Sequence, residues 1–387
     1  MSSKDRSHIH HQEKITKGPL LAKEVVVTTD PINFKPVVVS NLLSSNSLKQ
    51  VDPLIRRSFE IRKSLIKDDN ICLKLVLDLD ETLVSFCDQQ DATVAVKSNK
   101  KLCQRKVETY GHVNYVIYPI YLEKWIQAVA KYYSIIVYSR GSDEYVKEVV
   151  KILDTTGVLI PQRNVIFREN ETALKDLQRV KFLKASDRNA VILDDCINVW
   201  MNYKSIFQNF LFSKIFLFNQ NSFNKLKSTE YFFKKDNQSF RLGPESSEIF
   251  LTTFEDYEER LINLENFLVR LANHYYDMVL RYPNYGFMWD IKNVLRDLRA
   301  DIFKEKDFFI ITDNPSLRNC TEYVLENMGA RISPIYSKEI TVLIESRSIG
   351  LAKTQASGSA KLVNIKYAFD SFFYGKAMDI KRYELSN

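Results

Sequence analysis

The chain has 387 residues, a net charge of +7 and a hydrophobic content of 45%. This length suits two or three domains, and the apolar content predicts that most of the chain folds around a core. The five cysteines show no Cys-x-x-Cys pairing, which argues against a disulfide framework or a zinc site and favours a reducing compartment. No apolar run reaches the roughly 18 residues of a membrane helix, and the first residues lack a signal-peptide pattern. The basic balance alone selects no partner.

Short apolar runs alternate with amphipathic helical segments between residues 73 and 193. The expected strands are Leu73–Leu77, Ser134–Tyr138, Asn164–Phe167 and Ala190–Leu193, with strand-like Thr93–Val96 and Val113–Tyr118 after the first. The expected helices are Leu122–Tyr132, which Pro119 opens, Ser142–Leu153 and Leu174–Lys181. This alternation predicts a parallel sheet with helices on both faces.

The pattern changes after Trp200. Residues 201–250 are rich in Phe, Asn and Lys and are expected to be irregular. Phe254–Leu280 is expected to be one long helix, either a coiled-coil arm or a helix packed on its own domain; its bulky aromatic positions favour packing. A second alternating unit begins near residue 307. Its expected elements are strands Phe308–Thr312, Arg331–Ser333 and Thr341–Ile344 and helices Ser316–Met328 and Ile365–Tyr374.

Acidic residues follow two of the expected parallel strands. Asp78 and Asp80 come after the first strand, and Asp194 and Asp195 come after the fourth. Ligands bind beyond the carboxyl ends of the strands in an open parallel sheet, so we expect these four carboxylates to meet in one crevice. Carboxylates this close require a cation, and a set of oxygen ligands suits Mg²⁺.

A hydroxyl and a lysine join this group. Ser139 follows the second strand, and Lys175 lies between the third and fourth. With Mg²⁺ present, a carboxylate can approach a phosphate and attack it, while a lysine and a hydroxyl offset the charge on the phosphoryl oxygens. Asp78 and Asp80 lie on the same side of an extended chain, which suits a nucleophile with an acid/base two positions on.

At these residues the chain resembles a known family. DLDET, from Asp78 to Thr82, resembles the D-x-D-x-T signature of haloacid-dehalogenase-type phosphotransferases. The branch that dephosphorylates the C-terminal repeat tail of RNA polymerase II is similar in four segments, in order and in approximate spacing: LVLDLDETL, IIVYSRGSDEYVKEVVKILD, LKDLQRV and AVILDDCINVW. The resemblance covers residues about 70–200. It implies a Mg²⁺-dependent protein serine/threonine phosphatase with an aspartyl-phosphate intermediate.

The resemblance also implies a role for each matching residue. Asp78 is the expected nucleophile and a magnesium ligand, and Asp80 is the expected general acid/base, whose backbone carbonyl would also reach the metal. The other implied roles are phosphoryl binding by Ser139, which replaces the usual Thr, and by Lys175, orientation of Lys175 by Asp194, and metal binding by Asp195.

Two departures from the family pattern concern the substrate side of the site. Only Pro119 remains of an Arg-Pro-Gly-like turn, and Cys196 stands where the family has an arginine. Arg140, next to Ser139, is a candidate substrate contact. The intervals between the motifs leave no room for a large cap, and an open site favours a macromolecular phosphate, such as a phosphoserine in an extended chain.

Residues about 300–387 resemble a BRCT domain in the segments FFIIT, MGARI, TVLIE and LVNIKYAFDSFFYG. Asp313 follows Thr312 where phosphopeptide-binding members have a glycine, so packing or partner docking is favoured over phosphopeptide binding. The expected organisation is a partly ordered leader (1–50), a HAD-like phosphatase core with a Rossmannoid parallel sheet (51–200), a helical insert packed on the core (201–299) and a small α/β BRCT-like domain (300–387).

This pairing of domains is characteristic of the larger, transcription-factor-associated members of the branch. The expected substrate is therefore the phosphorylated C-terminal tail of RNA polymerase II, in the nucleus, with general transcription factors as further partners and without direct binding to membranes or nucleic acid. Two alternatives stay open. One is a HAD phosphatase of another phosphoprotein or of a small metabolite, and the other is a non-catalytic phosphopeptide-binding scaffold.

Overall fold

The structure is a computed structural model of the chain, and it describes part of the residues. The described residues are 64–65, 68–80, 82–98, 100–167, 175–177, 183–186, 188–194, 200, 231–235, 238–242, 257–284, 286, 289–337, 340–344 and 362–385. The expected leader at 1–50 and most of the helix expected at 174–181 lie outside these residues.

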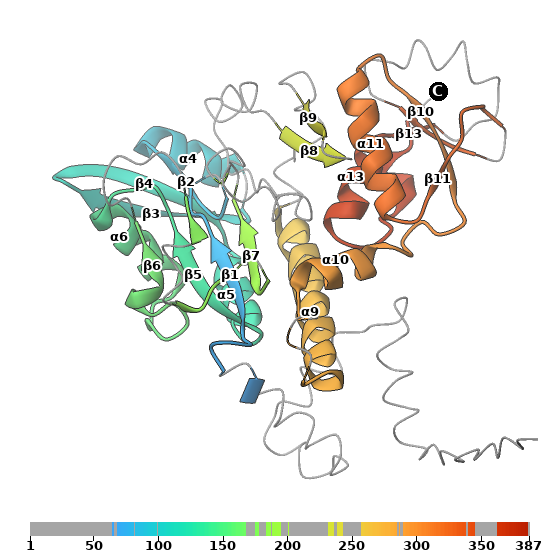
Figure 1. The fold of residues 1–387 in the computed structure, drawn as a ribbon. Coiled ribbons are helices and arrows are strands. Elements are labelled where there is room, and N and C mark those ends of the chain that lie inside the picture. The colour runs from blue at the N-terminus through green and yellow to red at the C-terminus, as the bar shows by residue number, and fades with distance from the viewer. Residues whose placement is uncertain are drawn as a thin grey trace, which may run out of the picture. The chain divides into compact units, whose positions relative to one another are not determined.

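A parallel sheet of four strands forms the centre of the N-terminal half. Its order is β6-β5-β1-β7, so β1 lies between β5 and β7 (Figure 1). The strands are β1 (Leu73–Leu77), β5 (Tyr133–Tyr138), β6 (Val165–Ile166) and β7 (Ala190–Leu193). Every residue of β1 is buried, as is typical of a central parallel strand, because its two faces are covered and both edges are paired. Helices α5 (Leu122–Val129) and α6 (Asp143–Leu153) contribute to the same core. The predicted parallel α/β class is confirmed.

The register of this sheet brings three strand ends to one level. Leu77, the last residue of β1, pairs with Val137 of β5 on one side and with Leu193 of β7 on the other. The residues that follow these strands therefore leave the sheet at the same edge.

The segment of the chain between β1 and β5 forms a separate antiparallel sheet. Its strands are β2 (Ser85–Cys87), β3 (Leu102–Thr109) and β4 (His112–Pro119), in the order β2-β4-β3, and helix α4 (Gln89–Ser98) lies between β2 and β3. The strand predicted at Thr93–Val96 is wrong, because this segment belongs to α4. Ala92 and Ala95 are buried at helical spacing, and the Asp88 side chain accepts a hydrogen bond from the N–H of Asp91 at 2.9 Å in the first turn.

Pro119 also has a different place from the one predicted. It is the last residue of β4, paired with Leu102, and α5 begins only at Leu122. A proline cannot donate to a strand ladder, which explains why the strand ends there.

Helix α9 (Tyr257–Arg281) packs against the same core as the parallel sheet. The Tyr276 hydroxyl donates to the carbonyl of Tyr132 at 2.8 Å, and the Tyr133 hydroxyl donates to the carbonyl of Leu268 at 2.7 Å. These contacts favour the packed helix over a coiled-coil arm. Within the described residues, no helix has both the length and the apolar character of a membrane span.

The C-terminal part forms a second parallel sheet, in the order β11-β10-β12-β13. Its elements are β10 (Asp307–Ile311), α11 (Pro315–Asn327), β11 (Arg331–Ile332), β12 (Thr341–Ile344), β13 (Leu362–Asn364), α13 (Lys366–Phe373) and a 3₁₀ turn at Ile380–Tyr383. The small α/β fold predicted here is confirmed. The sequence did not predict β13, which is only three residues long.

One part of the segment predicted to be irregular is a hairpin. Strands β8 (Tyr231–Lys235) and β9 (Gln238–Leu242) pair with each other in antiparallel register. Each strand has only five residues and lies among polar residues, so the sequence shows no clear strand pattern here.

Two arginines, the half-buried Arg270 and the buried Arg299, join the C-terminal part to α9 and to α10 (Ile291–Arg299). Arg270 of α9 donates to the carbonyls of Tyr374 and Gly375 at 3.1 and 2.5 Å. Arg299 of α10 donates to the carbonyl of Phe372 at 2.9 Å, and its guanidinium lies 3.9 Å from the centre of the Phe372 ring. These bonds satisfy C-terminal carbonyls of α13, a position that favours cations.

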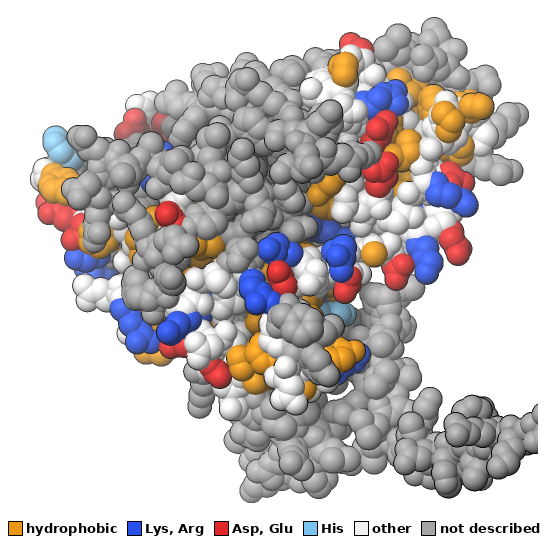
Figure 2. Space-filling view, in the orientation of Figure 1, with side chains coloured by type: hydrophobic (Ala, Val, Ile, Leu, Met, Phe, Trp, Pro, Cys, Tyr) orange, Lys and Arg blue, Asp and Glu red, His pale blue; other side chains and the backbone are white. Residues whose placement is uncertain are grey.

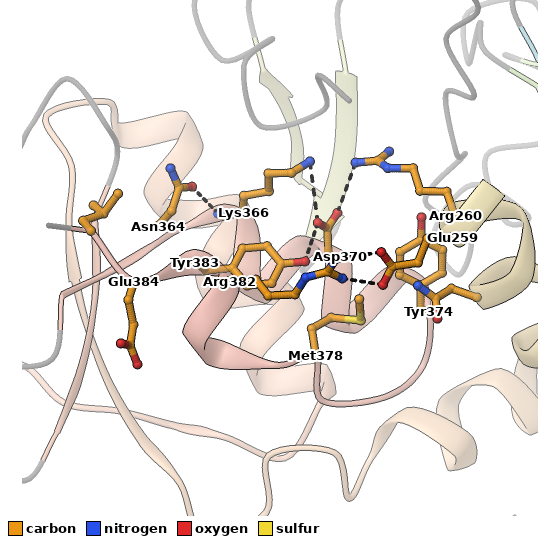
Figure 3. Close-up of a pocket in the computed structure, with 12 residues that line it drawn as sticks. Glu259, Arg260, Asn364, Lys366, Asp370, Tyr374, Met378, Arg382, Tyr383 and Glu384 are labelled. Carbon is orange, nitrogen blue, oxygen red and sulfur yellow. Dashed lines mark hydrogen bonds and ion pairs between the residues drawn. The ribbon is translucent and has the colours of Figure 1, made fainter. Parts of the chain in front are cut away.

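A polar cavity of about 330 Å³ lies between α9 and the C-terminal part (Figure 3). Two of its acidic side chains, Glu259 and Asp370, pair with basic ones. Arg382 forms a two-point ion pair with Glu259, and Lys366 and Arg260 lie 3.5 and 4.0 Å from Asp370. On the face shown in Figure 2, basic side chains are likewise interspersed with acidic ones over the described surface.

Candidate active site

Three residues predicted for the site leave the central sheet at its carboxyl edge. Asp78 follows β1, Ser139 follows β5 and Asp194 follows β7. The N–H of Asp78 donates to the carbonyl of Leu193 at 2.9 Å, and the N–H of Ser139 donates to the carbonyl of Ile166 at 3.0 Å. The backbone ladder therefore continues one residue beyond the strands and fixes the positions of Asp78 and Ser139.

Lys175 lies between two of these carboxylates. Its Nζ is 2.8 Å from Oδ1 of Asp78 and 2.5 Å from Oδ2 of Asp194. Its side chain is only 2% exposed. Burial alone would lower the pKa of Lys175, but the charges of Asp194 and Asp78 outweigh burial and raise the pKa above its ordinary value. The lysine is therefore a fixed buried cation next to the predicted nucleophile.

Two aromatic residues complete the surroundings of Lys175. The indole N–H of Trp200 donates to Oδ2 of Asp194 at 2.8 Å. The rings of Tyr138 and Trp200 are each centred 5.9 Å from the Lys175 Nζ. Sequence reasoning gave neither residue a role. Trp200 could have been found from the family motif AVILDDCINVW, in which it is the last residue. An aromatic residue after a buried strand is, however, usually a core residue.

Ser139 and Arg140 differ in exposure. Ser139 is buried, and its Oγ accepts a hydrogen bond from the N–H of Gly141 at 3.0 Å. Arg140, the candidate substrate contact, is exposed. The buried hydroxyl thus has a fixed position at the sheet edge, whereas the guanidinium faces outward.

The DLDET loop folds back on itself. The N–H groups of Thr82, Leu83 and Val84 all donate to the carbonyl of Leu79, at 3.2, 2.8 and 3.0 Å. Thr82, the last residue of this segment, is fully buried. The turn sets the direction of Asp80, whose Oδ1 accepts a hydrogen bond from the hydroxyl of Tyr145.

The predicted metal ligands are only partly described. Asp78 offers a carboxylate and Asp80 its backbone carbonyl from the same loop, and these oxygen donors fit Mg²⁺, which takes one or two carboxylates. Asp195, the third predicted ligand, lies outside the described residues, as does Cys196. Among the residues that the structure describes, no group of three or more His, Cys, Asp or Glu side chains could hold a metal ion.

The fold and the site together define a class of protein. A parallel α/β sheet with Asp-x-Asp after its first strand, and a lysine between carboxylates at the same edge, has the organisation of the haloacid-dehalogenase-like fold. Residues 73–241 match the sequence model of the NLI interacting factor-like phosphatases. This match covers less than half of the chain, and it confirms the predicted resemblance to RNA polymerase II C-terminal-domain phosphatases.

Two curated relatives are named as phosphatases of the C-terminal domain of RNA polymerase II. The protein of Encephalitozoon cuniculi is 31% identical over 130 residues, which are 33% of this chain and 29% of that protein. The protein of Schizosaccharomyces pombe is 24% identical over 140 residues, 33% of this chain and 19% of that protein. The matches thus span less than a third of either relative.

Among solved structures, the chain is similar to that of Fcp1, described as an essential RNA polymerase II CTD phosphatase. The sequence identity is 19% and the TM-score is 0.53, over 86% of this chain and 100% of the Fcp1 chain. At this identity the likeness concerns the fold.

Proposed function

We propose that this protein is a Mg²⁺-dependent protein serine/threonine phosphatase. The observation that carries the proposal is the buried Lys175 between Asp78 and Asp194 at the carboxyl edge of the sheet. Two carboxylates on a buried cation offer little to stability alone, because desolvation offsets their attraction. A phosphate that enters this edge finds a carboxylate and a fixed cation together, which suits phosphoryl transfer.

Asp78 attacks the phosphorus of a phosphoserine. The bond between phosphorus and the serine oxygen breaks, and an aspartyl-phosphate forms on Asp78. Asp80 gives its proton to the departing serine oxygen and then accepts a proton from the water that attacks the phosphorus, so that phosphate leaves and Asp78 is regenerated. Lys175 and Ser139 offset charge on the phosphoryl oxygens throughout. Asp194 and Trp200 hold Lys175 in place.

Asp78, Asp80 and Asp195 would hold the Mg²⁺ ion. When bound, the ion would offset the negative charge that the carboxylates and the phosphate bring together. Arg140, exposed beside Ser139, is proposed to contact the substrate chain outside the crevice.

The proposed substrate is the phosphorylated C-terminal tail of RNA polymerase II, and the proposed location is the nucleus. The names of the two curated relatives support both. General transcription factors as further partners stay a prediction from the domain pairing, and direct binding to nucleic acid is not expected.

The substrate class is tested by comparing two kinds of phosphate ester. With Mg²⁺ we expect the purified chain to hydrolyse phosphoserine peptides of the polymerase tail repeat about 10-fold or more faster, in kcat/KM, than sugar phosphates, because an open site can use contacts with the peptide on both sides of the phosphoserine. Released phosphate is measured at equal substrate concentrations. A chelator in excess of the Mg²⁺ is expected to stop both reactions.

Any other result of this comparison would favour one of the alternative functions. Preference for sugar phosphates would mean a metabolite phosphatase, and preference for an unrelated phosphopeptide would mean another phosphoprotein substrate. Binding of the tail peptide without hydrolysis would mean a scaffold.

A further inference from the structure

Tyr145 is a buried tyrosine whose hydroxyl points into the candidate active site. It lies in the first turns of α6, and its hydroxyl donates a hydrogen bond to Oδ1 of Asp80, 65 positions earlier in the chain. The residue is 7% exposed. Tyr145 is one of the buried residues of α6, together with Val146 and Val149, and this position accounts for the ring but not for the hydroxyl.

Two neighbours fix the ring of Tyr145. The Phe86 ring meets it edge-on, with centroids 5.2 Å apart and an interplanar angle of 86°. On another side, Gly141 leaves the space that the ring fills, because a Cβ there would lie 2.6 Å from Cδ1 of Tyr145. The N–H of Gly141 also donates to Oγ of Ser139. The short segment from Ser139 to Tyr145 thus connects the predicted phosphoryl-binding hydroxyl with the predicted acid/base.

We propose that Tyr145 is a positioning residue that orients the Asp80 carboxyl group for proton transfer to the leaving oxygen. This inference rests on the proposed phosphatase function. The last torsion of an aspartate has a broad, roughly two-fold distribution, so a free carboxyl group samples many orientations. General acid catalysis requires the proton donor within about 3 Å of the leaving oxygen, in a suitable direction. A hydrogen bond from a fixed phenol to one carboxylate oxygen restricts this torsion.

The leaving group distinguishes positioning of Asp80 from support of the fold. When the bond from phosphorus to a serine oxygen breaks, the alkoxide must receive a proton, and Asp80 supplies it. A p-nitrophenol group leaves as a stable phenolate and needs no proton in that step. The value of kcat/KM covers the steps up to loss of the leaving group and leaves out the later hydrolysis of the aspartyl-phosphate, which both substrates share. A misoriented Asp80 therefore lowers kcat/KM for the phosphopeptide and spares kcat/KM for the aryl phosphate, whereas general damage to the site lowers both.

The test is Tyr145→Phe, assayed with Mg²⁺ on a phosphoserine peptide and on p-nitrophenyl phosphate. We expect kcat/KM for the phosphopeptide to fall by about 10- to 100-fold, with a change of less than about 3-fold for the aryl phosphate, since general acid catalysis typically contributes about 10² to 10⁴. Asp80→Asn should show the same selectivity with a larger loss. Gly141→Ala, which displaces the ring but keeps the hydroxyl, should also slow the phosphopeptide selectively.

Tyr133→Phe is the matched control. Tyr133 is another buried tyrosine; it lies at the start of β5, and its hydroxyl donates to the carbonyl of Leu268 in α9. Without this hydroxyl, both reactions should keep their wild-type rates. Equal losses on the two substrates in Tyr145→Phe, or an unchanged phosphopeptide rate, would overturn the inference while leaving the phosphatase function intact. If the wild type hydrolyses neither substrate, the proposed function fails and the inference fails with it.

Discussion

Replacing Asp78 with asparagine is expected to lower phosphatase turnover by at least about 10³-fold, because an amide cannot form the covalent intermediate. The fold should survive, since asparagine has nearly the same shape and Lys175 keeps its 2.5 Å contact with Asp194. Phosphate release from a phosphopeptide and chemical denaturation, measured on the same preparation, separate the two effects.

Asp297→Asn is the control for this substitution. Asp297 is an aspartate of α10 with a 73% exposed side chain, and the substitution removes one negative charge from the surface. Its turnover should equal that of the wild type. An Asp78→Asn protein that retains more than about a tenth of the wild-type rate would mean that another group is the nucleophile.

Lys175→Met is expected to remove activity and also to destabilise the fold by about 3–5 kcal/mol, the usual cost of breaking a buried ion pair from one side. The substitution leaves Asp78 and the fully buried Asp194 without their cation. Because the folded state raises the pKa of Lys175, its contribution to stability is fully present below the ordinary lysine pKa and is lost only as the pH rises through the raised value. Urea denaturation at neutral pH measures the loss.

A double substitution identifies the cause of this instability. Lys175→Met combined with Asp194→Asn removes one of the two uncompensated charges and keeps an acceptor for the Trp200 indole, so it should recover part of the stability without recovering activity. Lys151→Met is the control, because it breaks an exposed pair with Glu148 and should cost less than about 1 kcal/mol. A stable Lys175→Met protein would show that the charges around Lys175 are solvated rather than buried.

The sheet and its carboxyl-edge residues could be predicted because buried parallel strands have a simple signature. Leu73–Leu77, apolar except for Lys74, and the apolar run Ala190–Leu193 both end at acidic residues, and the structure has the same boundaries. Lys175 could be placed only through the family motif, since a single lysine between elements carries no pattern of its own. Its position between Asp78 and Asp194 depends on the strand register.

The sequence did not indicate the aromatic contacts of the site. Tyr145 and Trp200 are buried aromatic residues of the kind expected in a core, and their polar atoms find partners that only the fold brings near. The helix at Gln89–Ser98 was missed because β-branched residues in a short segment favour a strand, whereas burial of Ala92 and Ala95 on one face decides for the helix.

The most direct test of the account is to trap the intermediate. A phosphopeptide is mixed with the wild-type protein and Mg²⁺, the reaction is quenched in acid within a single turnover, and borohydride then reduces any acyl phosphate to an alcohol that mass spectrometry can locate. We expect position 78 to be reduced to homoserine only when Mg²⁺ and phosphopeptide are both present, and we expect no such product from Asp78→Asn. Full-rate turnover without a modified Asp78, or with the modification at another residue, would contradict it.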